Sequence, residues 1–345
     1  MNQTWQEHEQ HISHGHPTVM ATQGYVLGVE ISNSGMRQSV ALANLHGQIV
    51  YHTRKQQHLP PDGQEAVTLL QQMISETCTP DRLKGQRVLR CGVAVGAPID
   101  ARRGSVRAMS RAQGWENLPL KDLLEQACKI PAIVENDANA AAIGEATFGA
   151  GVGEHNLVYI GLGRGIGAGI LLNNAIYHGA TTMAGEIGHT MVKEDGPLCP
   201  CGRRGHLEAI ASAQAIVRTM IGVSVEYPET EEAIRRVTGG RAEAMTVEQV
   251  FRIADAGDPI AQRVIGEALH YLAISVANLV NVLDPGMIIV GGAVALAGDL
   301  LFEPLRQMVP PLCLRPLTEP IKILPSALGS DATLKGAVAL ALQDI

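Results

Sequence analysis

A three-strand pattern that occurs twice in the chain constrains its fold more than any other feature. The first copy predicts strands at 25–31, 39–44 and 48–52, and the second predicts strands at 156–161, 168–172 and 175–177. The copies begin about 130 residues apart, each has a first turn rich in glycine or polar residues, and helices follow both. Apolar runs broken by such turns are typical of antiparallel meanders. The architecture is therefore duplicated, although the sequence is not.

The rest of the pattern predicts further elements around these two copies. Asp258 is a typical N-cap residue, and Pro259 suits the first turn of a helix. At roughly 100–200 residues per domain, the 345 residues indicate two domains. Aromatic residues make up only 3% of the chain, so small and branched aliphatic residues must build the cores. We expect strands at 88–95 and 287–290, and helices at 63–78, 138–148, 259–283 and 331–343.

Composition excludes several classes of protein. The net charge of −7 argues against general nucleic-acid binding. The longest apolar stretch, 271–283, is shorter than the roughly 18 residues of a membrane span, and we expect it to be a buried helix. The N-terminus lacks the pattern of a secretory signal, and the six cysteines do not form a disulfide framework. We therefore expect a cytoplasmic protein that is not bound to a membrane.

The first 24 residues differ in composition from the rest of the chain. They are polar and contain four histidines, at positions 8, 11, 14 and 16. We expect a disordered, solvated tail, with a metal-binding tail as the alternative.

Two histidines and two cysteines within 18 residues predict a metal site. His189, Cys199, Cys201 and His206 offer two imidazoles and two thiolates, which suit tetrahedral zinc. Four protein ligands leave no open position on the ion, so the expected role of Zn²⁺ is structural. The alternative is that two cysteines fall in one loop by chance.

The same segment carries a resemblance to a known family. Gly-Glu-Ile-Gly-His at 185–189 is followed by Cys-Pro-Cys-Gly-Arg-Arg-Gly-His-Leu-Glu at 199–208. This resembles the signature of the ROK proteins, which are bacterial glucokinases, related sugar kinases and sugar-responsive repressors. His206 stands where the family usually has its third cysteine, and histidine can also bind zinc. The resemblance covers roughly residues 25–345 and includes Glu-Asn-Asp-Ala-Asn at 135–139.

The resemblance implies a hexose-type sugar as the ligand. The residues that would hold its hydroxyls are Asn136, Asp137, Glu186, His189 and Glu208. Carboxylates and an amide suit such a ligand, because each hydroxyl both donates and accepts hydrogen bonds. One ring nitrogen of His189 would bind zinc while the other faces a hydroxyl. Asn136 and Asp137 could instead cap the following helix, and capping and binding are compatible.

The resemblance also makes Asp137 the catalytic base, which would accept the proton of the attacking hydroxyl. The position of Asp137 at a helix N-terminus predicts a lowered pKa for its carboxylate. A weak base is sufficient, because phosphoryl transfer passes through a loose transition state.

The first phosphate-binding turn departs from the family pattern. Active members have an Asp-x-Gly-x-Thr-like turn after the first strand, whereas this chain has Glu-Ile-Ser-Asn-Ser at 30–34. The carboxylate of Glu30 and the hydroxyl of Ser34 are kept, but glycine is lost at Ser32 and Asn33. Close approach of the backbone to phosphates favours glycine. Glu30 or a neighbour would help to place Mg²⁺.

The second phosphate-binding turn departs less. It reads Gly163, Arg164 and Gly165, where the family usually has Gly-Thr-Gly. Arg164 would either contact phosphate or block the space for it. Gly291 and Gly292, which correspond to the adenosine-side glycines of the family, are present. Taken alone, a turn of this kind is equally consistent with a plain hairpin.

Four arginines fall within ten residues, at positions 102, 103, 107 and 111. We expect a solvated loop there, with contact to a phosphorylated ligand or a partner as the alternative. Trp115 follows this loop, and we expect it to be packed rather than stacked on a sugar.

Two functions are consistent with these features. The preferred one is an ATP-dependent hexose or amino-hexose kinase, because the sugar residues and the base are all present. The alternative is a catalytically silent sugar sensor from the repressor branch, because both phosphate turns are altered. Those repressors carry a helix-turn-helix module of roughly 60 residues before the first strand, and only 24 residues precede it here. We therefore expect no direct DNA binding.

The fold class that follows is α/β, with the two-lobed, actin-like architecture of sugar kinases. The small lobe would comprise residues 25–136 and 331–345, and the large lobe residues 137–330 with the zinc loop at about 186–208. The sugar would lie in the cleft between the lobes. Because dimers are common in the family, we expect a homodimer.

Overall fold

The computed structural model describes residues 23–32, 37–108, 114–314 and 321–345. The tail histidines, Ser34 and Arg111 lie outside these ranges. The strands are β1 (Tyr25–Ile31), β2 (Gln38–Asn44), β3 (Ile49–Lys55), β4 (Val88–Val95), β5 (Ile99–Asp100), β6 (Ser105–Val106), β7 (Ala132–Asn136), β8 (Leu157–Leu162), β9 (Ile166–Leu172), β10 (Ala175–Ile176), β11 (Met287–Gly291) and β12 (Lys322–Pro325). The α-helices are α1 (Gly63–Thr77), α2 (Pro80–Leu83), α3 (Leu120–Cys128), α4 (Asp137–Phe148), α5 (Glu208–Ala211), α6 (Ala213–Ser224), α7 (Pro228–Thr238), α8 (Val247–Asp255), α9 (Pro259–Leu283), α10 (Asp299–Met308) and α11 (Ala332–Leu342).

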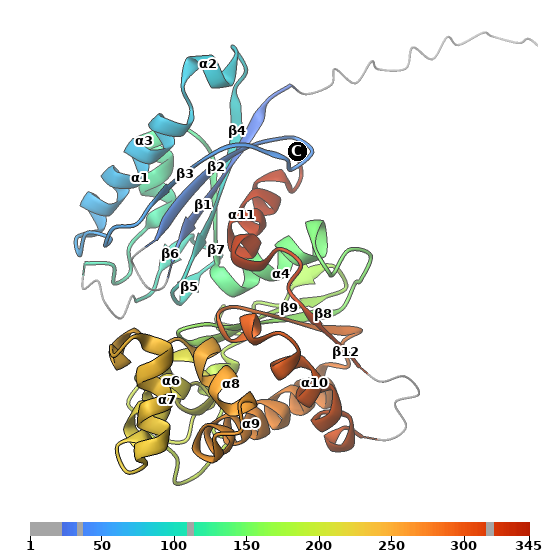
Figure 1. Ribbon diagram of the computed structural model, residues 1–345. Coiled ribbons are helices and arrows are strands. Elements are labelled where there is room, and N and C mark those ends of the chain that lie inside the picture. Colours follow the sequence, from blue (N-terminus) through green and yellow to red (C-terminus); the bar gives the residue numbers. More distant parts are fainter. Residues whose placement is uncertain (1–22, 33–36, 109–113, 315–320) are drawn as a thin grey trace, which may run out of the picture.

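Two five-stranded sheets with the same topology form the framework (Figure 1). The N-terminal sheet has the order β3-β2-β1-β4-β7, and the C-terminal sheet has the order β10-β9-β8-β11-β12. In each, the first three strands form an antiparallel meander and the last two run parallel to the first strand of that meander. The predicted duplication is confirmed. Ligands of such sheets bind beyond the carboxyl ends of the parallel strands, which are β1, β4 and β7 in one sheet and β8, β11 and β12 in the other.

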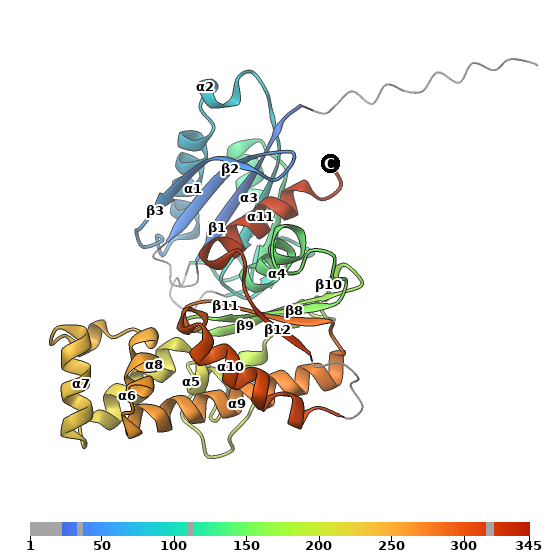
Figure 2. The ribbon, with the colours of Figure 1, turned by 45° about the vertical axis from the view of Figure 1, so that its right-hand side comes forward.

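The two sheets are joined through a pair of closely packed helices. Helix α11 packs on β1 and β4, helix α4 packs on β8 and β9, and the two helices pack on each other between the sheets (Figure 2). Their contact is built from alanine and glycine. A Cβ atom at Gly336 would overlap the carbonyl oxygen of Ala140, and a Cβ atom at Gly144 would stand 2.8 Å from the backbone nitrogen of Gly336. Only glycine allows so close a crossing.

Other helices cover the outer faces of the sheets. Leu70 and Met73 of α1, with Leu120 and Leu124 of α3, pack against one face of the N-terminal sheet. Helices α6, α8, α9 and α10 bury the corresponding face of the C-terminal sheet. Among the described helices, α9 alone has the length and composition of a membrane span, but over half of its most apolar window is buried inside the protein. The prediction of a buried helix ending at Leu283 is confirmed.

The segment around residue 100 differs from the sequence-based expectation. We expected a solvated loop, but β5 and β6 form a short antiparallel hairpin there. Arg102 and Arg103 are exposed, whereas Arg107 is half-buried because its guanidinium donates to Asp100 and to the carbonyl oxygen of Thr181. Trp115 is fully buried, as predicted. Strand β12 was not predicted.

Candidate sugar and metal site

The predicted base and its neighbour lie where strand β7 passes into helix α4. The side-chain oxygen of Asn136 accepts hydrogen bonds from the backbone N–H groups of Ala138 (2.9 Å) and Asn139 (3.3 Å), so Asn136 is the N-cap of α4. Its amide nitrogen donates to the carbonyl oxygen of Ala97 (3.3 Å). One amide hydrogen of Asn136 is left for a ligand. The capping interpretation is therefore correct, and it leaves room for binding.

The protonation of Asp137 differs from the expectation. Burial raises its pKa to about 6, although the N–H of Ala138 acts to lower it, and the charges of Glu30 and Glu186 raise it further. The helix N-terminus does favour the charged form. Removal of water from the carboxylate, together with two nearby acidic groups, outweighs that effect. The prediction of a lowered pKa was wrong, and Asp137 is a stronger base than the sequence indicated.

Glu186, another predicted sugar residue, is close enough to Asp137 for its charge to raise the pKa of Asp137. Glu186 precedes a single 3₁₀ turn (Ile187–His189), and its Oε2 lies 3.9 Å from Nε2 of His189. Burial raises the pKa of Glu186, while the charge of His189 lowers it and that of Glu208 raises it. Glu186 therefore interacts electrostatically with both Asp137 and Glu208, which links the three carboxylates into one group, and it lies beside the imidazole of His189.

The carboxylate of Glu208 rests on the glycine-rich turn. Its Oε2 accepts a hydrogen bond from the backbone N–H of Ile166 at 3.0 Å. A Cβ atom at Gly165 would stand 2.5 Å from the same oxygen. Gly165 is thus required to make room for a predicted sugar ligand, a reason that the sequence pattern did not suggest.

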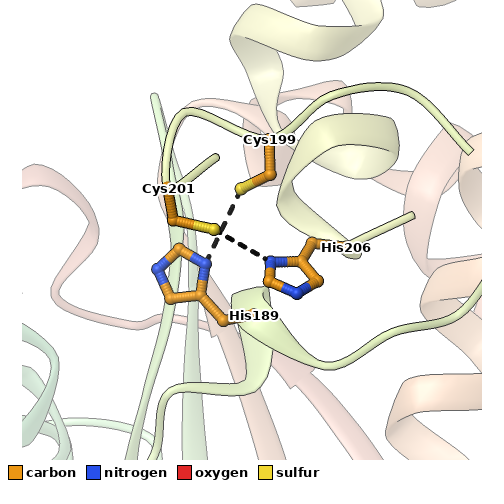
Figure 3. A group of neighbouring side chains, drawn as sticks. All are labelled: His189, Cys199, Cys201 and His206. Carbon is orange, nitrogen blue, oxygen red and sulfur yellow. Dashed lines mark hydrogen bonds between the residues drawn. The ribbon is translucent and has the colours of Figure 1, made fainter. Parts of the chain in front are cut away.

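The four predicted metal ligands converge in one place (Figure 3). Their ligand atoms all lie within 4.8 Å of one another. Sγ of Cys199 is 3.7 Å from Nδ1 of His189, and Sγ of Cys201 is 3.2 Å from Nδ1 of His206. Ligands on a tetrahedral zinc ion are about 3.3–3.8 Å apart, given bonds of about 2.3 Å to sulfur and 2.0–2.1 Å to nitrogen. The side chains therefore fit such an ion with little movement.

The protonation states of two cluster residues bear on metal binding. Burial raises the pKa of the Cys199 thiol to about 11, with Cys201 beside it. Burial and the neighbouring charges of His189 and Arg203 lower the pKa of His206, so its ring is neutral, which is the form that binds metals. Nδ1 of His189 points to the sulfur atoms and Nε2 to Glu186. His189 therefore links the metal cluster to the carboxylate group.

In the first of the predicted nucleotide segments, Glu30 forms a partly buried ion pair with Arg37. Glu30, at the end of β1, is only 3% exposed, and its Oε1 lies 2.5 Å from Nη2 of Arg37. Its Oε2 is buried without a hydrogen-bond partner among the described residues. A buried carboxylate oxygen of this kind can hold a cation directly or through water.

The other two predicted nucleotide segments, the turn at 163–165 and the glycines at 291–292, follow strands β8 and β11 of the C-terminal sheet. Gly161 of β8 lies opposite Gly291 of β11. Gly292 has a φ of +91°, and a Cβ atom there would stand 2.5 Å from the backbone oxygen at the end of β8. A Cβ atom at Gly163 would meet nothing closer than 4.0 Å. Arg164 is exposed, and within the described chain its side chain makes no hydrogen bond or ion pair.

Sequence reasoning did not assign a role to Glu135 or His178, which contact the predicted site residues directly or through each other. Glu135 accepts hydrogen bonds from the N–H of Asn136 (2.8 Å) and the amide of Asn139 (3.0 Å), and its other oxygen lies 2.7 Å from Nε2 of His178, whose pKa this bond raises. Glu135 and His178 also line a cavity of about 910 Å³ that none of the predicted sugar residues lines. The position of Glu135 beside Asn136 was a usable signal. Nothing in the sequence pairs it with His178, or Arg37 with Glu30.

Comparison with known proteins agrees with this geometry. A model of the ROK family matches residues 26–344. A glucokinase of Halalkalibacterium halodurans is 36% identical over 323 residues, which cover 92% of this chain and 94% of that enzyme. A xylose repressor of Caldicellulosiruptor bescii is 28% identical over 327 residues, which cover 93% of this chain and 79% of the repressor.

Solved structures extend the likeness to the fold. A ROK family glucokinase from Streptomyces griseus, solved in complex with glucose and AMPPNP, superposes with a TM-score of 0.78 at 31% identity. The match covers 93% of this chain and 100% of that one. The predicted α/β fold of the actin-like sugar kinases is confirmed.

Proposed function

The chain belongs to the ROK family, and from that premise we propose that it is a sugar kinase that transfers the γ-phosphoryl group of ATP to a hydroxyl of a hexose or amino-hexose. The observation that carries the proposal is the group of three carboxylates, Asp137, Glu186 and Glu208, beside the imidazole of His189. A neutral ligand with many hydroxyl donors suits such a group, since each carboxylate oxygen can accept a hydroxyl hydrogen.

Asp137 has the properties of the general base. With a pKa of about 6 it is largely ionised at neutral pH, yet it is basic enough to take a proton from an attacking hydroxyl. Asn136, Glu186, His189 and Glu208 would orient the sugar so that one hydroxyl faces Asp137. Orientation of this kind provides much of the rate acceleration in phosphoryl transfer.

The residues proposed to bind ATP contribute binding groups rather than a reacting side chain. ATP supplies the phosphoryl group when it is bound. Gly163 and Arg164 would approach its phosphates, and Gly291 and Gly292 its adenosine. The open space at Gly163 and the unengaged side chain of Arg164 are consistent with this role. The buried Oε2 of Glu30 would help to hold Mg²⁺.

The proposed metal is a structural Zn²⁺ held by His189, Cys199, Cys201 and His206. It would take the place of the proton that the buried thiol of Cys199 otherwise keeps, and it would fix the ring of His189. Because the other nitrogen of that ring faces Glu186, the ion would set the shape of the sugar site without touching the sugar.

One observation favours a second function, a sugar sensor without catalysis. The Glu30–Arg37 ion pair places a cation at the carboxylate that would otherwise serve Mg²⁺. A xylose repressor among the relatives matches 93% of this chain at 28% identity, which is consistent with a regulatory role. In a sensor the same carboxylate group would bind the sugar, and no phosphoryl group would move.

An ADP-release assay separates the two functions. The protein would be incubated with Mg-ATP and, in turn, glucose, fructose, mannose, allose and the N-acetylhexosamines, beside Asp137→Asn and a control, Asp255→Asn, whose carboxylate is exposed on α8. A kinase gives turnover that disappears in Asp137→Asn and persists in Asp255→Asn. Thermal stabilisation by a sugar without turnover would overturn the kinase proposal in favour of the sensor.

The proposal retains four expectations from the sequence. Residues 25–136 and 331–345 form the small lobe, residues 137–330 form the large lobe, the protein is a cytoplasmic homodimer, and it does not bind DNA directly. Sedimentation, cell fractionation and a DNA mobility assay measure the last three.

A further inference from the structure

Residues 177–185, here called the strap, connect β10 to the proposed sugar ligand Glu186. Both ends of the strap are held on β9. The N–H of Tyr177 donates to the carbonyl oxygen of Ile170 at 2.8 Å, and the carbonyl oxygen of Gly185 accepts from the N–H of Ala168 at 2.9 Å. The position of Glu186 therefore depends on the conformation of the strap immediately before it.

Three hydrogen bonds connect the strap to the part of the chain that carries the N-terminal sheet. The hydroxyl of Thr182 lies 2.8 Å from the carbonyl oxygen of Ile99 and 2.6 Å from that of Thr181, so its single hydrogen is shared between the two. Nη2 of Arg107 donates to the carbonyl oxygen of Thr181 at 3.0 Å. Nε2 of His178 lies 2.7 Å from the carboxylate of Glu135 at the end of β7. The strap is thus the place where the β5–β6 hairpin and β7 reach across to the sugar-binding side of the C-terminal sheet.

The backbone of Thr182 is in an unfavourable conformation. Its φ is +60°, in the left-handed region. The other non-glycine residues with positive φ in the described chain are lysine, asparagine and aspartate, and Thr182 is the only β-branched one. A β-branched residue is disfavoured there, and such a conformation persists only where its surroundings hold it. The contacts that hold Thr182 include the hydroxyl bond to Ile99 and the adjacent bond from Arg107.

We propose that Thr182 is a positioning residue that holds Glu186 in the sugar site by fastening the strap to the β5–β6 hairpin. While the hydroxyl of Thr182 is bonded to Ile99, the strap keeps its strained form and Glu186 faces Asp137. When the bond is lost, the backbone relaxes toward negative φ, and Glu186 moves with it. This role rests on the proposed function only in that Glu186 binds a sugar.

A consequence is that sugar binding and the approach of the two sheets are coupled. A sugar on Glu186 favours the fastened strap, and the fastened strap requires the hairpin to be close. The two equilibria are thermodynamically linked. The factor by which the hairpin contact raises the affinity for sugar equals the factor by which bound sugar favours the contact.

Four variants separate positioning from ordinary packing. Thr182→Ser keeps the hydroxyl, Thr182→Val removes it but keeps the branch, and Thr182→Gly removes the hydroxyl together with the strain. Thr68→Val is the control, because Thr68 lies on the exposed side of helix α1 and its hydroxyl bonds only the carbonyl oxygen of Gln64 in the same helix.

The first measurement needs no ligand. Hydrogen–deuterium exchange is followed at residues 99–107 and 178–187 in each variant. Thr182→Val should exchange faster in both segments, Thr182→Ser should match the wild type, and Thr68→Val should change neither segment. Arg107→Gln should raise exchange in the same segments, and its effect should not add to that of Thr182→Val, because both fasten one strap. Unchanged exchange in Thr182→Val would overturn the proposal.

The second measurement is glucose binding by calorimetry without nucleotide, repeated with the other sugars of the panel. The Kd should rise roughly 3- to 10-fold in Thr182→Val, as the loss of one hydrogen bond predicts. It should rise less in Thr182→Gly, which has no strain to release, and stay within about twofold in Thr182→Ser. A Kd that is the same in all variants while exchange rises would overturn the link to Glu186. If no sugar binds the wild-type protein, the proposed function fails, and exchange alone decides whether the strap is fastened.

Discussion

The substitution Gly165→Ala tests the proposed sugar site by adding one Cβ atom beside the carboxylate of Glu208. Gly165 has no positive φ, so its backbone accepts alanine. The new Cβ atom would stand 2.5 Å from Oε2 of Glu208, which is too close. That oxygen is the end of a flexible side chain, so the carboxylate can turn away, but it then loses the N–H of Ile166. We expect the fold to survive and the predicted sugar ligand to be displaced.

The expected magnitudes follow from these contacts. A hydrogen bond to a charged group contributes about 1.5–3 kcal/mol, so losing one between Glu208 and a sugar hydroxyl should raise the sugar Kd roughly 10- to 150-fold. The free energy of unfolding should change by less than about 1 kcal/mol. The lost bond to Ile166 lowers stability, whereas replacing glycine by alanine raises it by restricting the unfolded chain.

The assay is calorimetric titration with the sugar that the kinase panel identifies, together with urea denaturation. The matched control is Gly163→Ala in the same turn, where the new Cβ atom meets nothing closer than 4.0 Å. It should leave sugar affinity unchanged. An unaltered sugar Kd in Gly165→Ala would refute the role of Glu208, and equal weakening by both variants would assign the effect to the turn itself.

Three further predictions concern the metal, the helix crossing and the base. His206→Ala should lower zinc affinity by more than the roughly 10- to 100-fold that is caused by changes to residues outside the ligand set. It should also weaken sugar binding, because His189 would lose its fixed position. Metal analysis and calorimetry measure the two effects, and a zinc content equal to that of the wild type would contradict the prediction. Gly336→Ala should destabilise the protein by roughly 1–3 kcal/mol in urea, because the Cβ atom overlaps a carbonyl oxygen of α4. The control Gly266→Ala, on open surface of α9, should stabilise by about 0.5–1 kcal/mol, so equal effects would refute the close crossing. Since the pKa of Asp137 is raised from 3.8 to about 6, its contribution to stability is full below pH 3.8 and is lost as the pH rises through about 6. Asp137→Asn should therefore be more stable than the wild type at pH 7, by up to about 3 kcal/mol, with a difference that vanishes near pH 4; thermal unfolding across this range shows whether it does.

Local signals in the sequence predicted most of the framework. Asp258 and Pro259 placed the start of α9, and Asn136 placed the start of α4, because a capping side chain bonds backbone groups only two or three residues away. The meander strands were found because alternation and turns are local properties. Strand β12 was not predicted because Lys322–Pro325 is short and pairs with β11, about 35 residues earlier in the chain.

The candidate sugar and metal residues could be predicted together because their motifs are short and lie close in the chain. The electrostatics were not found, because charges interact through space. The raised pKa of Asp137 depends on burial and on Glu30 and Glu186, which come from other elements. The same holds for the ion pair of Glu30 with Arg37, whose geometry depends on how β1 and β2 pair.

The sequence by itself determined the strand order within each meander, the helix caps, the four side chains that converge as candidate metal ligands, and the family. These depend on side-chain types at fixed spacing along the chain. Only the tertiary structure decided that Gly165 makes room for Glu208, that burial outweighs the helix N-terminus at Asp137, and that Thr182, beside the carbonyl oxygen of Ile99, is in the left-handed region. Each of these depends on distances between segments far apart in the chain, and the packing of the two sheets around α4 and α11 sets those distances.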